Sequence, residues 1–244
     1  MILQTMTEEE RLYEVFRQTR WLYDWLCELG GEITDKFKRT IRYPYIQRYR
    51  RTDNRGNHWR MVVILPNKTM KKKRKYLTMC YVVYENPPRH KEKYDNAGKG
   101  VMMLSPLAMM EYINTKYESH TKMAAIMDII PHAFHRYTQR CLAKDGKSDY
   151  DIHKKLEFLL MSYMHFDVTP SEDDKNANKH QDDGWLPYDV MMKDGGILRG
   201  HLMNGMLIRF FTYIGKDDLY DSQEERYEEM KKEALQWKVQ GKYI

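Results

Sequence analysis

Two sets of strand-like segments joined by short turns limit the folds that this chain of 244 residues can adopt. The first set comprises residues 41–49, 58–65 and 76–84, and the second comprises residues 185–192, 197–203 and 206–214. The segments alternate in polarity or are rich in β-branched and aromatic residues, as strands are. Turn residues at 53–57 and the pair Asn204–Gly205 are typical of hairpins. The sequence therefore predicts two antiparallel β regions, with Pro44 placing the first strand at a sheet edge.

Helical periodicity surrounds these β regions. Thr7 and Glu10 have capping-box spacing, and apolar residues then recur at helical intervals up to Gly30–Gly31, which predicts a helix that ends at the glycines. Helices are also expected at residues 105–117, 122–130, 149–166 and 222–237, and Pro131 either kinks a helix or begins a new one that runs to residue 142. The expected fold class is α+β: an N-terminal helix and basic antiparallel strands, a helical middle, then a C-terminal antiparallel hairpin sheet and terminal helix.

Two polar segments suggest where the chain divides. Residues 86–100 contain two prolines and two glycines, and residues 169–184 are rich in Asp, Asn and Lys, so both are expected to be loops or connectors. We expect a helix plus basic β region over residues 1–95 and the remaining helices and strands over residues 96–244. A single domain with one sheet shared by both regions is the alternative.

Positive charge is concentrated in one part of the chain. The formal net charge is +6, yet residues 36–93 hold 18 Lys or Arg against three acids, so the remainder of the chain is net acidic. Arginines alternate there with Tyr43, Tyr45, Tyr49 and Trp59, and a lysine run follows at residues 71–75. Cations that neutralise phosphates beside rings that stack on bases are typical of proteins that bind RNA or single-stranded DNA.

The expected nucleic-acid-binding residues are Arg48, Arg50, Arg51, Arg55, Trp59, Arg60, Lys71, Lys72, Lys73, Arg74 and Lys75. The alternative interpretation is that these charges keep an exposed strand soluble, because lysine and proline also protect sheet edges from pairing with other chains.

Other classes of protein are disfavoured. The apolar stretches are too short for a membrane helix, and the first residues lack the basic start and apolar core of a secretory signal. Cys27, Cys80 and Cys141 lie far apart in apolar segments, so we expect reduced core cysteines in a cytoplasmic protein. No glycine-rich phosphate loop and no metal-binding motif is present, and we predict neither a cofactor nor a metal.

Residues 131–142 contain the densest group of reactive side chains. In a helix His132, Arg136 and Arg140 share one face, while Ala133, Phe134 and Tyr137 point inward. An imidazole can transfer a proton near neutral pH, and guanidinium groups bind phosphate and stabilise developing charge. This combination suits RNA cleavage by the 2′-hydroxyl, although a solvated helix face has the same pattern.

The residues His132-Ala133, Arg136 and Arg140 resemble the HAxxRxxxR helix of small bacterial and phage-associated proteins near the barnase, EndoU and RelE-type ribonuclease superfamily. In that superfamily helices precede an antiparallel sheet, an order that is similar here after Pro131. The resemblance implies a metal-independent ribonuclease with His132, Arg136 and Arg140 as catalytic residues. It also points to possible partners on the following strands, namely Arg199, His201, Arg209 and Thr212.

Two hypotheses about function follow. In the first, this is a nucleic-acid-associated protein of a phage or mobile element with ribonuclease activity, in which His132 acts as acid or base and the arginines hold the phosphate. In the second, it is a non-catalytic binding or protein-interaction module, and the helix row is only a surface. RNA or DNA is the expected partner in the first, and no membrane is expected in either.

Overall fold

A computed structural model describes residues 6–65, 67–72, 75–86, 98–105, 111–112, 125–168, 185–203, 207–221, 224–225, 227–229 and 232. The fold class is α+β, as predicted. The chain forms two compact units, one of residues 1–84 with 101–127 and one of residues 85–100 with 128–244. Each unit is therefore built from two segments that are not continuous in the sequence.

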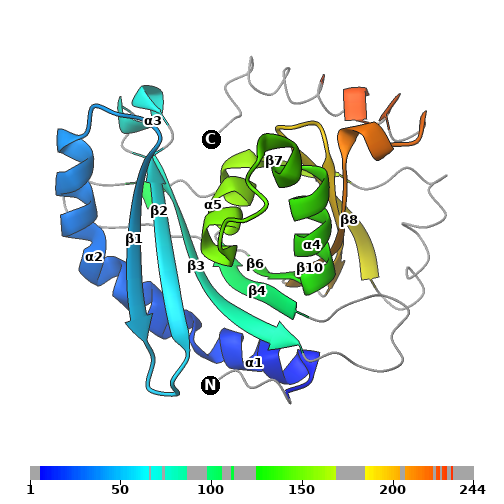
Figure 1. The fold of residues 1–244 in the computed structure, drawn as a ribbon. Coiled ribbons are helices and arrows are strands. Elements are labelled where there is room, and N and C mark those ends of the chain that lie inside the picture. The colour runs from blue at the N-terminus through cyan, green and yellow to red at the C-terminus, as the bar shows by residue number, and fades with distance from the viewer. Residues whose placement is uncertain are drawn as a thin grey trace. The chain divides into compact units, whose positions relative to one another are not determined.

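Two helices begin the first unit (Figure 1). The predicted capping box is confirmed, since Thr7 and Glu10 cap α1 (Glu8–Arg17) reciprocally. The predicted stop at Gly30–Gly31 is wrong, because α2 (Thr19–Arg39) continues through both glycines. A helical glycine costs about 1 kcal/mol. Ile33 and Phe37 beyond it are buried, and each gains about 1.5–3 kcal/mol by leaving water, which outweighs that cost.

The sheet of the first unit has the order β1-β2-β3-β4, with β1 at its edge as Pro44 predicted. Its strands are β1 (Tyr45–Thr52), β2 (His58–Leu65), β3 (Lys75–Asn86, which belongs to this unit up to Tyr84) and β4 (Gly98–Ser105, which belongs to it from Val101). The short strand β5 (Glu111–Tyr112) pairs with β3. β1, β2 and β3 pair antiparallel, which confirms the first predicted hairpins. A short helix, α3 (Lys68–Lys72), lies between β2 and β3. The predicted lysine tip is thus helical in its first part.

The helix α2 packs on one face of this sheet. The ring of Phe37 lies 5.8 Å from the ring of Tyr45 on β1 and 5.3 Å from that of Tyr76 on β3, both edge to face. Trp25 and Ile33 of the same helix are also buried. The apolar stripe of α2 therefore supplies much of the core of the first unit.

The sheet of the second unit has the order β6-β10-β9-β8-β7. Its strands are β6 (Ala125–Ile129, of which Asp128 and Ile129 belong to this unit), β7 (Tyr163–Val168), β8 (Trp185–Met192), β9 (Ile197–Met203) and β10 (Leu207–Ile214). Strands β7 to β10 pair antiparallel with their neighbours. The three C-terminal strands are confirmed within a residue of their predicted bounds, and Asn204–Gly205 lie outside the described residues.

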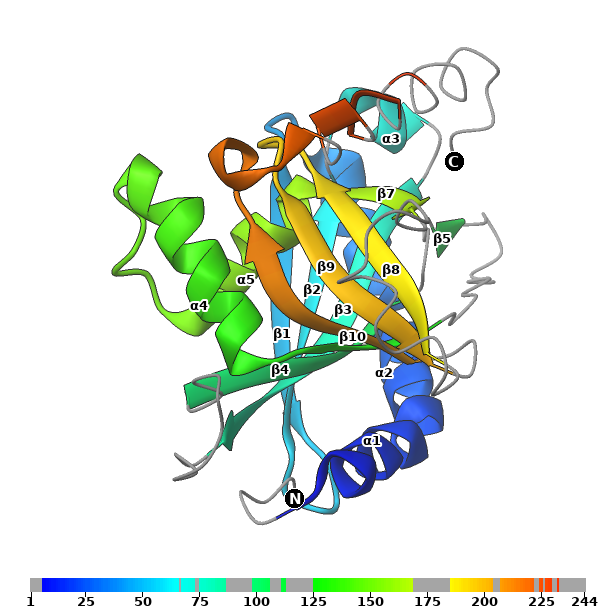
Figure 2. The same cartoon turned by 90° about the vertical axis from the view of Figure 1, so that its right-hand side faces the viewer.

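One face of this sheet is covered by helices (Figure 2). α4 (Pro131–Arg140) has Pro131 in its first turn, so the proline begins a helix. The helix packs on β10 through Ala133, Phe134 and Tyr137, which are buried. The rings of Tyr137 and Tyr213 lie 5.3 Å apart. The 3₁₀ turn η1 (Leu142–Asp145) and α5 (Ile152–Ser162) follow, and η3 (Lys216–Asp218) comes after β10.

Two predicted helices are wrong. Residues 122–130 contain the strand β6. The helix prediction failed there because a short apolar run without polar alternation fits a buried strand as well as a buried helix. In the predicted helix 105–117, Ser105 ends β4 and residues 111–112 form β5, while the other residues lie outside the described part. The helix predicted over 149–166 ends at Ser162, where β7 begins. Within the predicted terminal helix, the residues that the structure describes are helical.

The three cysteines differ in burial. Cys80 is buried and Cys141 half-buried, but Cys27 is exposed on α2, so it is not the core residue that was expected. Within the described residues, no helix has both the length and the apolar character that crossing a bilayer requires.

Candidate nucleic-acid interface

The alternation of β1 separates its side chains into two sets. Tyr45, Tyr49 and Arg51 point toward α2: the Tyr49 hydroxyl donates to Glu32 at 3.4 Å, and Arg51 Nη1 lies 2.6 Å from Glu28 Oε2. Successive side chains of a strand point to opposite faces. Arg48 and Arg50 therefore lie on the sheet face away from α2.

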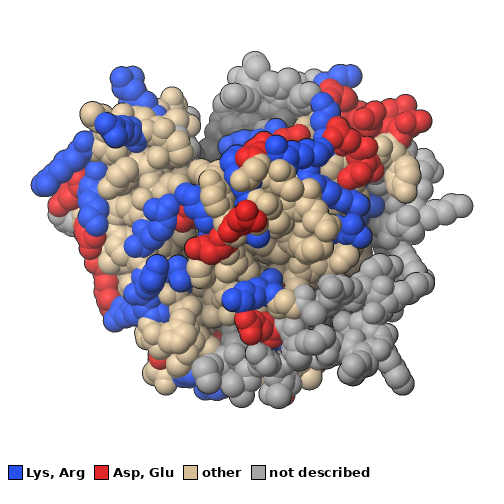
Figure 3. Space-filling model, viewed as in Figure 1, with Lys and Arg blue, Asp and Glu red and all other residues tan. Residues whose placement is uncertain are grey.

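The register of β1 and β2 adds a third arginine to this face. Arg50 is directly opposite Arg60, and Arg48 is opposite Val62. Directly opposed residues of an antiparallel pair share a face. We call Arg48, Arg50 and Arg60 the basic face. Arg48 and Arg50 are exposed and Arg60 is half-buried, and Figure 3 shows Lys and Arg side chains gathered over β1 and β2.

The turn between β1 and β2 is held by a buried carboxylate. Asp53 Oδ1 accepts the backbone N–H groups of Arg55 and Asn57 at 2.8 and 2.9 Å, and Asp53 Oδ2 accepts Asn57 Nδ2 and Trp59 Nε1, both at 2.8 Å. Burial alone would raise the pKa of Asp53, but the donors from Asn57, Trp59 and the backbone outweigh it, so the pKa of this carboxyl is lowered. The loop is therefore rigidly organised around an ionised group.

A second buried carboxylate positions Arg55. Glu14 of α1 is buried and accepts Arg55 Nε at 2.6 Å and Asn57 Nδ2 at 3.1 Å. The Arg55 side chain remains 38% exposed. Its backbone N–H and its Nε are both held by carboxylates, so the side chain would lose little further entropy on binding an anion.

Besides Arg55, the predicted binding residues Trp59, Arg51 and Lys71 are engaged within the protein. Trp59 is fully buried with its indole N–H on Asp53, so its ring is not available to stack on a base. Arg51 is paired with Glu28, and its Cζ lies 5.4 Å from the centroid of the Trp21 ring. Lys71 Nζ donates to the backbone oxygens of residues 38 and 40 at 2.8 and 2.7 Å, which satisfies the C-terminal carbonyls of α2.

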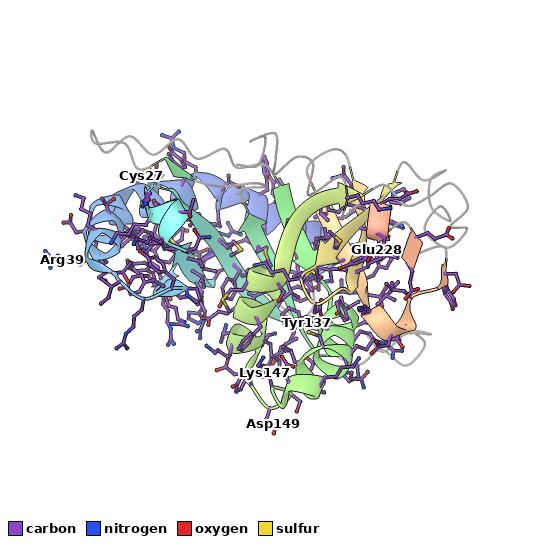
Figure 4. All side chains as sticks on the ribbon, turned by 90° about the horizontal axis from the view of Figure 1, so that it is seen from above. Cys27, Arg39, Tyr137, Lys147, Asp149 and Glu228 are labelled. Atoms are coloured by element: carbon purple, nitrogen blue, oxygen red, sulfur yellow. The ribbon has the colours of Figure 1, made fainter. Side chains whose placement is uncertain are left out.

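The rest of the predicted lysine run is only partly described. Lys72 is exposed at the end of α3. Lys73, Arg74 and the side chain of Lys75 lie outside the described residues. Arg39, at the C-terminal end of α2 (Figure 4), adds an exposed cation to the first unit.

The predicted catalytic row lies on α4 as its spacing indicated. His132, Arg136 and Arg140 are all half-buried. Arg136 Nε lies 3.5 Å from His132 Nε2, so these two side chains are neighbours on α4. Arg140 is engaged elsewhere: its Nη1 donates to the backbone oxygen of Tyr213 at 3.0 Å, and its Nε lies 3.2 Å from Asp218 Oδ2.

The strand residues proposed as partners of this row lie on the other face of the sheet. Tyr213, which contacts Tyr137 of α4, is opposite Leu198 in the register, whereas Arg199 is opposite Thr212 and His201 is opposite Arg209. Alternation therefore places Arg199, His201, Arg209 and Thr212 away from the face that α4 covers. The structure does not bring these residues together with the α4 row.

Two of the strand arginines are neutralised by buried carboxylates. Arg199 makes three hydrogen bonds to Asp189, at 3.1, 3.1 and 2.8 Å, and Arg209 Nε lies 3.0 Å from Asp128 Oδ2. His201 is also buried, with its ring 4.6 Å from that of Phe211. Guanidinium groups that are paired and buried in this way are not open to a phosphate.

A half-buried thiol, that of Cys141, lies at the C-terminal end of α4. Burial and a hydrogen bond to Asp194 raise the pKa of Cys141 to about 12, and the Tyr213 hydroxyl donates to the same carboxylate. A cysteine nucleophile needs a lowered pKa. Cys141 is therefore a structural residue. Among the described residues, no group of three His, Cys, Asp or Glu side chains could hold a metal ion.

The sequence prediction missed the carboxylates that decide which arginines are available. Glu14, Asp53, Asp128 and Asp189 are all buried. Asp53 carried a signal, because an aspartate at the start of a turn commonly accepts backbone N–H groups two residues later. Glu14 falls among the inward residues of α1, but its partner Arg55 is 41 residues away. Asp189 could be found only from the register that sets it opposite Arg199.

Comparisons with known protein families, with curated proteins and with solved structures found no match to this chain. The resemblance of residues 132–140 to a ribonuclease helix stays a prediction.

Proposed function

We propose that the protein binds nucleic acid through the basic face formed by Arg48, Arg50 and Arg60, without cleaving it. The observation that carries the proposal is the direct opposition of Arg50 and Arg60 across β1 and β2. Like charges that are directly opposed across two strands destabilise a sheet. Within the part of the chain that the structure describes, no ion pair with a carboxylate offsets either guanidinium. A bound phosphate backbone would relieve this repulsion.

The alternative, that these charges only protect the edge strand, fits the structure less well. An edge is protected by charges on the outermost strand or by charges that point inward from it. Arg60 is on β2, which is paired on both sides, so it protects no edge. The turn that follows β1 is also fixed by hydrogen bonds to Asp53 and Glu14. Charges that only keep a strand soluble do not require a turn of fixed conformation.

The test is binding of a fluorescein-labelled 20-nucleotide single-stranded RNA, measured by anisotropy at several salt concentrations. Each lost phosphate contact lowers the salt dependence of log affinity by about 0.7 on a single strand. Arg50→Ala with Arg60→Ala should therefore weaken binding at least tenfold at low salt and lower the slope by about 1.4. Arg39→Ala with Arg42→Ala removes the same charge from exposed positions and is the matched control.

Two results would contradict the proposal. One is wild-type protein that does not bind the RNA at 50 mM salt. The other is an Arg50/Arg60 double variant that binds as tightly, and with the same salt slope, as the control double variant. Circular dichroism of each variant ensures that a loss of binding is not a loss of fold.

RNA cleavage by the α4 row is a second candidate function, and one observation favours it. Arg136 Nε lies 3.5 Å from His132 Nε2, so an imidazole that can transfer a proton and a guanidinium that can bind a phosphate lie side by side on α4. Against it, Arg140 is held by Asp218 and the strand arginines are paired with carboxylates. Cleavage of end-labelled RNA by the wild type in the presence of EDTA, and not by His132→Ala, would establish this function.

A further inference from the structure

A pocket of about 350 Å³ lies within the first unit, where α1 meets α2 beside the turn between β1 and β2. Three arginines, one tryptophan, one aspartate and one asparagine are among the residues that line it: Arg17, Arg20, Arg55, Trp21, Asp24 and Asn54. This volume is at the lower end of the roughly 300–1,000 Å³ range of small-molecule sites. The pocket therefore has room for one nucleotide and not for a run of stacked bases.

The charges of this pocket favour a doubly charged anion. Arg55 is fixed by Glu14 through its Nε, which leaves its terminal nitrogens for a ligand. Arg17 is exposed, and its Cζ lies 5.6 Å from the centroid of the Tyr13 ring. Arg20 is 89% exposed and only loosely paired with Asp24, at 3.7 Å. An internal phosphodiester carries one charge, whereas a terminal phosphate carries about 1.5–2 at neutral pH. Guanidinium forks bind such a group in a bidentate manner.

The same pocket offers groups for a nucleobase. Trp21 lines it, and the orientation of this ring is set by Trp25, at 5.8 Å between centroids, and by Arg51, at 5.4 Å. Stacking on an aromatic ring contributes about 1–3 kcal/mol per base. The amide of Asn54 adds a donor and an acceptor that can reach a base edge.

We infer that this pocket binds a nucleotide that carries a terminal phosphate, with the arginines on the phosphate and Trp21 against the base. This inference rests on the proposed function, because the nucleotide in the pocket would be the terminal nucleotide of the bound strand. A free nucleoside monophosphate has the same chemistry, and the experiment separates the two sources.

The experiment compares four 12-nucleotide RNAs of one sequence, with a phosphate or a hydroxyl at the 5′ or the 3′ end and an internal fluorescent label. The wild type should bind one of the phosphorylated RNAs at least tenfold more tightly than its hydroxyl counterpart. Arg17→Ala with Arg20→Ala should abolish this preference and leave the affinity for hydroxyl-ended RNA within about twofold of wild type. The Arg39→Ala, Arg42→Ala control should keep the preference. Equal wild-type affinities for phosphate and hydroxyl ends overturn the inference of a strand end.

Calorimetry with adenosine 5′-monophosphate and with adenosine makes the pocket testable apart from RNA binding. If the wild type binds neither the phosphate-ended nor the hydroxyl-ended RNAs, the proposed function fails. In that case, binding of the monophosphate but not of adenosine supports the pocket as a site for a free nucleotide. If the monophosphate also fails to bind, or binds equally well to the Arg17/Arg20 double variant, the pocket inference is overturned. If hydroxyl-ended RNA binds through the basic face but no end preference exists, the proposed function stands and the inference of a strand end falls.

Discussion

Replacement of Asp53 by asparagine should destabilise the first unit strongly. The carboxylate accepts four hydrogen bonds, two at each oxygen, from the turn between β1 and β2 and from the Trp59 indole. Asn has nearly the same shape but offers only one oxygen, so two buried donors lose their acceptor and face an amide NH₂ instead. A hydrogen bond to a charged group contributes about 1.5–3 kcal/mol. Because the two losses share one site and are not additive, Asp53→Asn should cost about 3–5 kcal/mol.

The pH dependence follows from the lowered pKa of Asp53 in the folded state. A carboxyl whose folded pKa lies below its unfolded value stabilises the protein fully above the unfolded pKa, and this contribution is lost as the pH falls through the folded pKa. The difference in stability between wild type and Asp53→Asn should therefore be largest at pH 6–7 and shrink below about pH 4, near the unfolded pKa of an aspartate.

Urea unfolding followed by tryptophan fluorescence measures this difference, since Trp59 is fully buried beside the carboxylate. Asp35→Asn is the control, because Asp35 makes only an exposed contact with Lys38, at 3.4 Å, and should change stability by less than about 0.5 kcal/mol. The reasoning is refuted if Asp53→Asn unfolds within about 1 kcal/mol of the wild type at pH 7, or if the difference between them does not change with pH.

Three further predictions concern other parts of the chain. Arg199→Ala leaves Asp189 buried without its partner and should cost about 3–5 kcal/mol, whereas Arg199→Met should cost less than Arg199→Ala; thermal denaturation followed by circular dichroism compares the two. Gly30→Ala should stabilise the protein by about 0.5–1 kcal/mol, because the added methyl meets open space within a helix, and a lower urea midpoint would contradict this. Iodoacetamide at pH 8 should alkylate exposed Cys27 and leave Cys141 unmodified until urea is added, as mass spectrometry of the peptides can determine.

The elements with strong local signals could be predicted from the sequence. β2 and the strands β8 and β9 have the predicted bounds, because β-branched runs between turn residues have few alternative structures. The Thr7 capping box was equally local. The predictions at Gly30 and at residues 125–129 were wrong because burial in the folded protein outweighs the local signal there. The apolar stripe that includes Ile33 extends α2 past its glycines, and β6 is stabilised by strands that are distant in sequence.

The candidate site was predictable only in its composition. An excess of arginine and aromatic residues between residues 36 and 93 indicated a polyanion partner, but it could not separate Arg50 from Arg51. These two neighbours point to opposite faces of β1, and Arg51 is paired with Glu28. Which arginine is available depends on strand register and on carboxylates far away in sequence, and a single sequence shows neither.

The two units use arginine in opposite ways, and salt should distinguish them. The pair of Arg199 and Asp189 is buried, so screening by ions reaches it little. Arg50 and Arg60 repel each other across a strand pair near solvent, so added salt relieves their repulsion in the free protein and competes with phosphates in the complex. Raising salt should therefore weaken RNA binding steeply without lowering the stability of the fold. If RNA binding weakened with salt to the same extent in the wild type and in the Arg50/Arg60 double variant, general positive charge would be the determinant of binding, and the register of β1 and β2 would have no part in it.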